Sequence, residues 1–173
     1  MSILNYFAYG SNNLQQLKDR NIYPINIQSG TLCDWTRIFG SFSKKWNGSV
    51  SSIYKCNNSK VYGIVYSITY HDIKKLMKYE KGYKLEIINV VLENQTTICA
   101  ITFIMDNYRL FDNIDNFIKP SKEYILAICK LLYERRCLLN KNLLKDYIID
   151  IKSIDCNKTI IYNECVIIKH NEI

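Results

Sequence analysis

Short β-prone segments, separated by turn residues, dominate the chain up to residue 105. Four of them follow one another between residues 25 and 68, and two more lie at 83–92 and 98–105. They are rich in β-branched and aromatic side chains, which favour strands. Helix-forming segments interrupt the strands without alternating regularly with them, which argues against a doubly wound parallel sheet. We predict an α+β fold, a small mixed β-barrel-like sheet with flanking helices.

Local signals give the expected boundaries of these elements. We expect strands at 3–8, 25–32, 35–39, 49–54, 61–68, 83–92 and 98–105, and an edge strand in the tail at 159–169. Helices are expected at 14–20, 71–80, 122–138 and 141–150. Asn12 or Asn13 can cap the first helix and Ser121 the third, while Gly82 marks the end of the second. No linker rich in Pro, Gly or Ser divides the chain, so residues 1–173 are predicted to form a single domain.

Several classes of protein are disfavoured by composition. The longest apolar runs are far shorter than the roughly 20 residues that cross a bilayer, so we expect no membrane span. The first residues lack a basic start and a long apolar centre, which favours a cytoplasmic location. The cysteines are seven, an odd number, and no two form a Cys-x-x-Cys pair. We interpret them as mostly buried thiols and expect neither disulfides nor a metal site.

The net charge of +7 indicates no particular partner. Nucleic-acid-binding proteins usually gather their basic residues in a stripe with interleaved aromatic side chains, whereas here they are spread along the chain. The densest group surrounds the helix at 71–80, at Lys74, Lys75, Lys78, Lys81 and Lys84. A solvated helix face explains this group better than a phosphate-binding surface, so we expect no nucleic-acid partner.

Glu80 is the most informative single residue. With Ile73, Leu76 and Met77 it falls at helical spacings of i, i+3, i+4 and i+7, so its carboxylate shares the apolar face. Burial there disfavours the ionised form and raises the pKa of the carboxyl group. The negative end of the helix dipole acts in the same direction. Such a carboxylate can take up and return protons near neutral pH.

A simpler interpretation of Glu80 is that it leaves a frayed helix end and pairs with Lys81 or Lys84. Periodicity alone favours this second interpretation over catalysis. The other carboxylates sit mostly at helix caps or on polar faces, and none occupies a comparable position.

The segment from Tyr6 to Asn12 is a second candidate, because it is a strand that ends in a turn and leads into a helix. Gly10 permits a close approach of the backbone, while Ser11 and Asn12 offer short hydrogen-bonding side chains. Free backbone N–H groups at such a junction favour an anion, such as the carboxylate of a ligand. The segment lacks both the Rossmann and the phosphate-loop glycine patterns, so nucleotide binding is unsupported. An ordinary strand-to-helix turn remains the alternative.

Taken together, these segments resemble the gamma-glutamylcyclotransferase family from Tyr6 to about Tyr147. Tyr6 to Asn12 looks like the YFAYGSN signature of that family without a gap, and Trp46 to Ile53 looks like its Trp-x-Gly-Gly segment. The segment 61–66 is similar to the strand before the catalytic helix. Pro120-Ser-Lys-Glu-Tyr124 resembles the start of the late helix of the family.

The resemblance implies roles for particular residues. Glu80 falls where the family carries its catalytic glutamate. Tyr124 and the signature would bind substrate, and the signature comprises Tyr6, Phe7, Ala8, Tyr9, Gly10, Ser11 and Asn12. The family commonly has an Asp where Met77 stands, and Lys81 here separates Glu80 from Gly82.

The reaction implied by the resemblance is the cyclisation of a gamma-glutamyl group to 5-oxoproline, with release of an amino acid. Glu80 would act as general acid and base, and no metal or organic cofactor would be needed. Two alternatives stay open: the same chemistry on gamma-glutamylamines or glutathione, and a catalytically inert binding module of the same fold. We expect a small-molecule partner, and an exposed apolar face on the tail would permit a homodimer.

Overall fold

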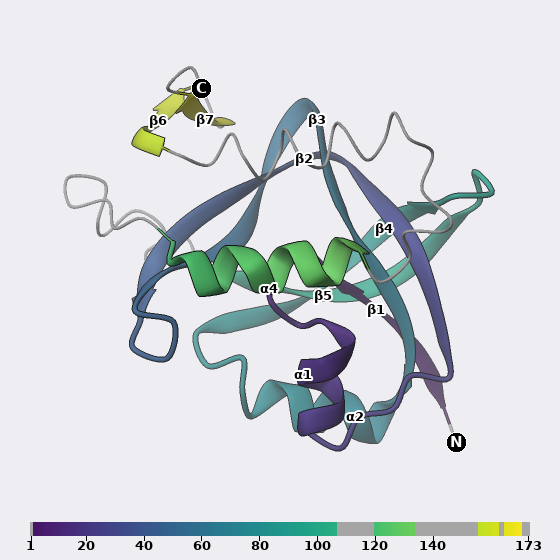
Figure 1. The fold of residues 1–173 in the computed structure, drawn as a ribbon. Coiled ribbons are helices and arrows are strands. Elements are labelled where there is room, and N and C mark those ends of the chain that lie inside the picture. Colours follow the sequence, from purple (N-terminus) through teal and green to yellow (C-terminus); the bar gives the residue numbers. More distant parts are fainter. Residues whose placement is uncertain (1, 107–119, 134–155, 163–164, 171–173) are drawn as a thin grey trace.

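The computed structural model describes residues 2–106, 120–133, 156–162 and 165–170 of the chain. Figure 1 shows the elements in chain order. The strands are β1 (Ile3–Ala8), β2 (Asn26–Ser43), β3 (Gly48–Thr69), β4 (Tyr83–Leu92), β5 (Thr97–Met105), β6 (Cys156–Tyr162) and β7 (Cys165–His170). The helices are α1 (Leu14–Asp19), α2 (Tyr70–Met77) and α4 (Lys122–Tyr133).

The first five strands form a closed barrel in the order β1-β3-β2-β4-β5. Neighbouring strands are antiparallel at every junction except one, where β1 meets β5 in parallel at Tyr6 and Ile101 and closes the barrel. This sheet confirms the predicted small mixed barrel of the α+β class. Closure also removes the unpaired strand edges that an open sheet would expose.

β2 and β3 form one long hairpin, so the prediction of four short strands between residues 25 and 68 is wrong in its boundaries. The register shifts between Cys33 and Trp35 and between Gly40 and Phe42. Asp34, which lies within the first shift, has a left-handed backbone with φ 62°. Such irregularities are β-bulges, in which an extra residue bends a strand without ending it. The residues at these two register shifts therefore mark bends within continuous strands rather than turns between separate strands.

Two of the four groups of buried side chains among the described residues account for most of the packing of the barrel and of α1 and α2. The barrel strands contribute the first, which includes Phe7, Val65 and Val90. Helix residues such as Leu17 and Leu76 join strand residues in the second. Alternate residues of β1 thus face different groups, as the two-residue period of a strand requires.

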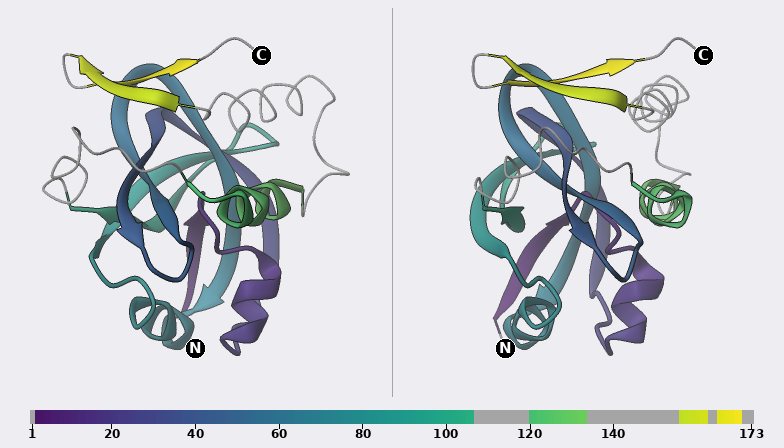
Figure 2. Two further views of the ribbon diagram at one scale, coloured as in Figure 1. Left: turned by 60° about the vertical axis from the view of Figure 1, so that its left-hand side comes forward. Right: turned by 90° about the vertical axis from the view of Figure 1, so that its left-hand side faces the viewer.

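The helices are placed as Figure 2 shows, with α1 and α2 at the same end of the barrel and α4 across its side. Asn13 caps α1 by accepting a hydrogen bond from the backbone N–H of Gln16 at 3.1 Å. Ser121 caps α4 in the same way, because its hydroxyl accepts from the N–H of Tyr124 at 3.2 Å. Both caps agree with the sequence prediction.

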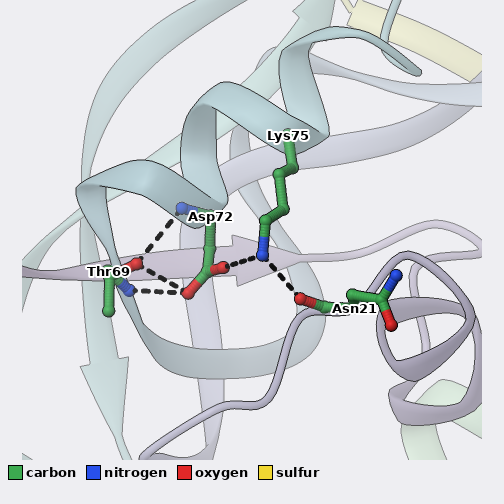
Figure 3. A network of polar contacts seen from close by, with 4 residues as sticks. All are labelled: Asn21, Thr69, Asp72 and Lys75. Atoms are coloured by element: carbon green, nitrogen blue, oxygen red, sulfur yellow. Dashed lines mark hydrogen bonds and ion pairs between the residues drawn. The ribbon is translucent and has the colours of Figure 1, made fainter.

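The start of α2 is fixed by the polar contacts drawn in Figure 3. Thr69 and Asp72 form a reciprocal capping box, in which each side chain accepts from the backbone N–H of the other residue. Lys75 Nζ lies 3.0 Å from the Asp72 carboxylate and donates to the carbonyl of Asn21 at 2.6 Å. These contacts tie α2 to the chain that follows α1, so the two helices are held in a defined relation.

Other expectations need correction. α2 ends at Met77, three residues before the predicted end, and the Met77 side chain is 53% exposed rather than buried on the inner face. Gly82 does adopt a left-handed backbone, with φ 87°, but in the turn that leads to β4 and not at the end of the helix. The tail contains a two-stranded sheet of β6 and β7 instead of one edge strand. The predicted helix at 141–150 and the predicted helical residues 134–138 lie outside the described residues.

The cysteines also differ from expectation. Cys33 and Cys99 are exposed, while Cys56 and Cys129 are partly buried, and all four are free thiols. The prediction of mostly buried thiols is therefore wrong for these four residues. Among the helices of the described ranges, none has the length and apolar character needed to span a bilayer.

Candidate active site

A cavity of about 300 Å³ opens beside the turn that joins β1 to α1. Its walls come from that turn, from the hairpin between β2 and β3, from the segment between α2 and β4, and from the first turn of α4. The lining includes seven of the residues predicted from sequence, which are Tyr6, Tyr9, Gly10, Ser11, Asn12, Glu80 and Tyr124. Residues far apart in the sequence thus meet at one site.

Glu80 lies just beyond α2, and its backbone N–H still bonds the carbonyl of Leu76 at 3.1 Å. This bond turns the chain so that the side chain enters the cavity, where it is only 15% exposed. Asn12 Nδ2 donates to Glu80 Oε1 at 2.9 Å. Burial raises the pKa of the Glu80 carboxyl group, although the hydrogen bond from Asn12 and the charges of Arg20 and Lys45 oppose the shift. The carboxyl group is held in place and holds its proton more readily than an exposed one.

Asn12 is fixed by three partners. Its Nδ2 group donates to the hydroxyl of Tyr6 at 2.6 Å as well as to Glu80. Its Oδ1 atom accepts from Arg20 Nη1 at 2.9 Å, which assigns the orientation of the amide. Arg20 lies 3.7 Å from Glu80 and stacks over the ring of Tyr79 at 4.5 Å. The result is a small network that points both the amide donor and a positive charge at the carboxylate.

At Gly10 the turn comes close to the opposite wall of the cavity. A Cβ atom at Gly10 would lie 2.8 Å from Ser51 Oγ and 3.3 Å from the hydroxyl of Tyr124. The Tyr124 hydroxyl accepts from the N–H of Ser51 at 2.9 Å and shares a 2.8 Å hydrogen bond with Ser51 Oγ. Glycine is therefore favoured here by close approach to two side chains rather than by a positive φ.

Tyrosine hydroxyls form much of the remaining polar wall. Tyr83 donates to the carbonyl of Ser51 at 2.8 Å, and Tyr9 donates to the carbonyl of Phe103. Burial raises the pKa of Tyr6, Tyr9, Tyr83 and Tyr124, so their hydroxyls stay neutral. Neutral phenols can offer hydrogen bonds without adding negative charge beside Glu80.

The hairpin between β2 and β3 adds Lys45 and Trp46 to the cavity. The ammonium group of Lys45 lies 5.0 Å from the centre of the Trp46 ring, and that ring packs edge-on against Tyr124 at 5.1 Å. Partial burial lowers the pKa of Lys45, and the nearby charge of Arg20 adds to this effect. In the described part of the lining, Arg20, Lys45 and Lys81 therefore outnumber the acidic side chains.

Two predicted site residues do not reach the cavity. The side chain of Phe7 packs in the barrel interior, and Ala8 is buried against residues of the helices. We therefore assign both to the core. Phe7 also explains why position 63 is glycine, because a Cβ atom there would lie 2.7 Å from the Phe7 ring and 2.3 Å from the carbonyl of Ala8.

Sequence reasoning missed several residues of the site, namely Arg20, Lys45, Ser51 and Tyr83. No local pattern could have identified Ser51 or Tyr83, since their roles depend on contacts across the barrel. Lys45 lies next to Trp46, which the family resemblance had singled out. Within the described part of the chain, no group of three His, Cys, Asp or Glu residues is placed to hold a metal ion.

The closed five-stranded barrel and the sequence both match known gamma-glutamyl cyclotransferases. The family model described as "Gamma-glutamyl cyclotransferase, AIG2-like" matches residues 6–125. A mouse protein named gamma-glutamylcyclotransferase is 28% identical over 134 residues, which cover 72% of this chain and 67% of the mouse protein. The bovine protein of the same name is 27% identical over 133 residues, with the same coverage.

A solved structure named gamma-glutamyl cyclotransferase shares the fold, with a TM-score of 0.73 over 90% of each chain at 23% identity. The chain belongs to the gamma-glutamyl cyclotransferase, AIG2-like family. The resemblance seen in the sequence is thereby confirmed, and so are the expected fold and the expectation that the protein is an enzyme of this class.

Proposed function

We propose that the protein cyclises the gamma-glutamyl group of gamma-glutamyl amino acids to 5-oxoproline, with Glu80 as the general acid and base. One observation carries the assignment to Glu80. Its carboxylate is sheltered in the cavity beside the glycine turn and receives a hydrogen bond from Asn12. Among the described residues, no other acidic side chain lines that cavity.

The proton transfers follow from the chemistry of the substrate. The α-amine of the glutamyl group is protonated at neutral pH, so Glu80 removes one proton before or during attack on the side-chain carbonyl carbon. A new carbon–nitrogen bond closes the five-membered ring. Glu80 then returns the proton to the departing nitrogen as the original amide bond breaks. The ring nitrogen loses its second proton to the released amine, which leaves as an ammonium group. A raised pKa suits both transfers, because the carboxylate binds the proton well and can still release it.

The turn after β1 is the proposed binding site for the glutamyl carboxylate and for the developing oxyanion. Among the described residues, no partner accepts a hydrogen bond from the backbone N–H groups of Gly10, Ser11 or Asn12. Donors that are fixed before the reaction stabilise a developing negative charge at little cost in reorganisation. The attack is intramolecular, so holding the substrate folded lowers the barrier further. The hydroxyl of Tyr124 stands 3.3 Å from the position of a Cβ atom at Gly10 and completes this end of the site.

A panel of gamma-glutamyl dipeptides, gamma-glutamyl-lysine and glutathione tests the proposal, with 5-oxoproline as the measured product. We expect the wild-type protein to release it from dipeptides and the Glu80→Gln variant to release almost none. Folded wild-type protein that turns over no member of the panel would instead favour the inert binding module. Faster turnover of glutathione or of gamma-glutamylamines would keep the chemistry and change the assigned substrate.

The cellular setting is part of the proposal. The free thiols of Cys33 and Cys99 are exposed, which suits a reducing compartment such as the cytoplasm. Fractionation of cells that express the tagged protein would test this location.

A further inference from the structure

The cavity holds more positive charge than the proposed reaction uses. Of the described residues that line it, Arg20, Lys45 and Lys81 are basic and Glu80 alone is acidic. Arg20 faces Glu80 at 3.7 Å and also bonds Asn12, so its charge belongs to the catalytic network. The two lysines are left to interact with a ligand.

The proposed substrate carries a negatively charged group that could pair with these lysines. A gamma-glutamyl amino acid carries two carboxylates, one on the glutamyl part and one on the amino acid that leaves. The turn at Gly10 to Asn12 is proposed to hold the first. The carboxylate of the departing amino acid lies beyond the amide bond that breaks. It therefore points away from Glu80 and toward the mouth of the cavity.

Lys45 lies at that mouth. It belongs to the hairpin turn between β2 and β3, and its side chain is exposed to solvent while it lines the cavity. Its ammonium group rests 5.0 Å from the centre of the Trp46 ring, a cation–π contact that limits the freedom of the long side chain. Trp46 in turn packs on Tyr124, whose hydroxyl bonds Ser51 beside Gly10. A continuous set of contacts therefore fixes Lys45 relative to the reacting end of the site.

Within the described residues, Lys45 takes part in no ion pair within 4.0 Å. Its charge acts on Glu80, which places the two groups within electrostatic reach of each other. Lys81 also lines the mouth, but it has no aromatic ring to hold it in the described contacts.

We propose that Lys45, supported by Trp46, binds the carboxylate of the departing amino acid and so makes the site selective for gamma-glutamyl amino acids over gamma-glutamyl amines. The inference rests on the proposed function, since it assigns the leaving side of the same site. A lysine exposed at the mouth can recruit an anionic group without the cost of burying a new charge.

A matched pair of substrates isolates this contact. Gamma-glutamyl-alanine and gamma-glutamyl-ethylamide differ only by the carboxylate of the leaving group. We expect the wild-type kcat/KM to be roughly tenfold higher for the alanine compound than for the ethylamide. That ratio corresponds to the free energy of one hydrogen bond to a charged group. Lys45→Met should reduce that ratio to near 1. Any effect of the lost charge on Glu80 acts on both substrates and cancels in the ratio.

Two further variants complete the test. Lys44→Met removes a neighbouring charge that does not line the cavity, and it should leave the ratio as in the wild type. Lys81→Met removes the second lysine at the mouth. A ratio that falls in Lys81→Met but not in Lys45→Met would overturn the proposal, and so would a ratio that Lys45→Met leaves unchanged.

Failure of the proposed function can be told apart from failure of this inference. If the wild-type protein turns over neither compound, the proposed function fails, and the subsite is then judged by calorimetric binding of the same two compounds. Tighter binding of gamma-glutamyl-alanine that is lost in Lys45→Met would support the subsite. Equal affinities for the two compounds would overturn it.

Discussion

Asn12 Nδ2 and Glu80 Oε1 are joined by a hydrogen bond of 2.9 Å across 68 positions of sequence. The bond connects the turn after β1 to the segment after α2, the two places that sequence analysis had singled out independently. Because Arg20 holds the other side of the Asn12 amide, the donor cannot rotate away from the carboxylate without losing a second bond. Geometry and charge around Glu80 are therefore set together by one network.

Replacing the proposed acid–base group should remove activity without damaging the fold. We expect Glu80→Gln to lower kcat by roughly 10²- to 10⁴-fold, the usual contribution of such a group. Burial raises the pKa of Glu80, so ionising it costs stability as the pH rises from 4.5 through the folded value. Glutamine cannot ionise, so the urea midpoint at pH 8 should equal or exceed that of the wild type. Retained turnover in this variant would rule out the assigned role.

Arg20 should set the pH at which the enzyme becomes active. Its positive charge favours the ionised form of Glu80 and opposes the shift caused by burial. Arg20→Met should therefore raise the pKa of Glu80 further and move the rising limb of the kcat/KM profile to higher pH. Lys18→Met removes an exposed charge from α1, which ends just before Arg20, and is the matched control. A limb that stays in place or moves to lower pH would contradict the electrostatic role.

The hydroxyl of Tyr124 should stabilise the fold through Ser51. It is the acceptor for the N–H of Ser51, a residue that is only 2% exposed. Tyr124→Phe leaves that donor unpaired, and we expect a loss of about 1–3 kcal/mol in the free energy of unfolding. Tyr70→Phe, at a tyrosine that is 53% exposed, should change stability by less than about 0.5 kcal/mol. Urea denaturation of both variants gives the comparison, and equal values would refute the proposed contact.

Substitution by alanine should affect stability differently at Gly63 and at Gly10. At Gly63 the new methyl group meets the backbone carbonyl of Ala8 and the ring of Phe7, so the barrel must distort. We expect a loss of about 1–3 kcal/mol or more in the free energy of unfolding. At Gly10 the nearest atom is Ser51 Oγ, a side-chain atom that can move at the expense of its bond to Tyr124.

Gly10→Ala should therefore keep most of the stability and lose activity, because the turn is displaced from the site. Thermal melting together with the 5-oxoproline assay distinguishes the two effects. Normal turnover in a folded Gly10→Ala protein would show that the close approach at this turn is not needed for catalysis.

The parts of the fold that depend on neighbours in the chain could be predicted from sequence. Strand β4 lies where its β-branched residues placed it, and Asn13 and Ser121 cap their helices as expected, because these features depend on residues a few positions apart. The helical spacing also indicated correctly that Glu80 faces inward. It failed for Met77, the last residue of α2, whose side chain is exposed. Glu80 lies beyond the helix and faces inward because its N–H still bonds the carbonyl of Leu76.

Tertiary structure alone decided the continuity of β2 and β3 and the composition of the site. Bulges and turns share the same polar residues, so only pairing across the hairpin distinguishes them. No local sequence pattern marks Arg20, Lys45 and Ser51 as functional. Their place in the site becomes evident only when the closed barrel brings them into one cavity with Glu80 and Tyr124. Side-chain identity fixes what each group can do, whereas burial and the distance to distant partners fix which of them can act together.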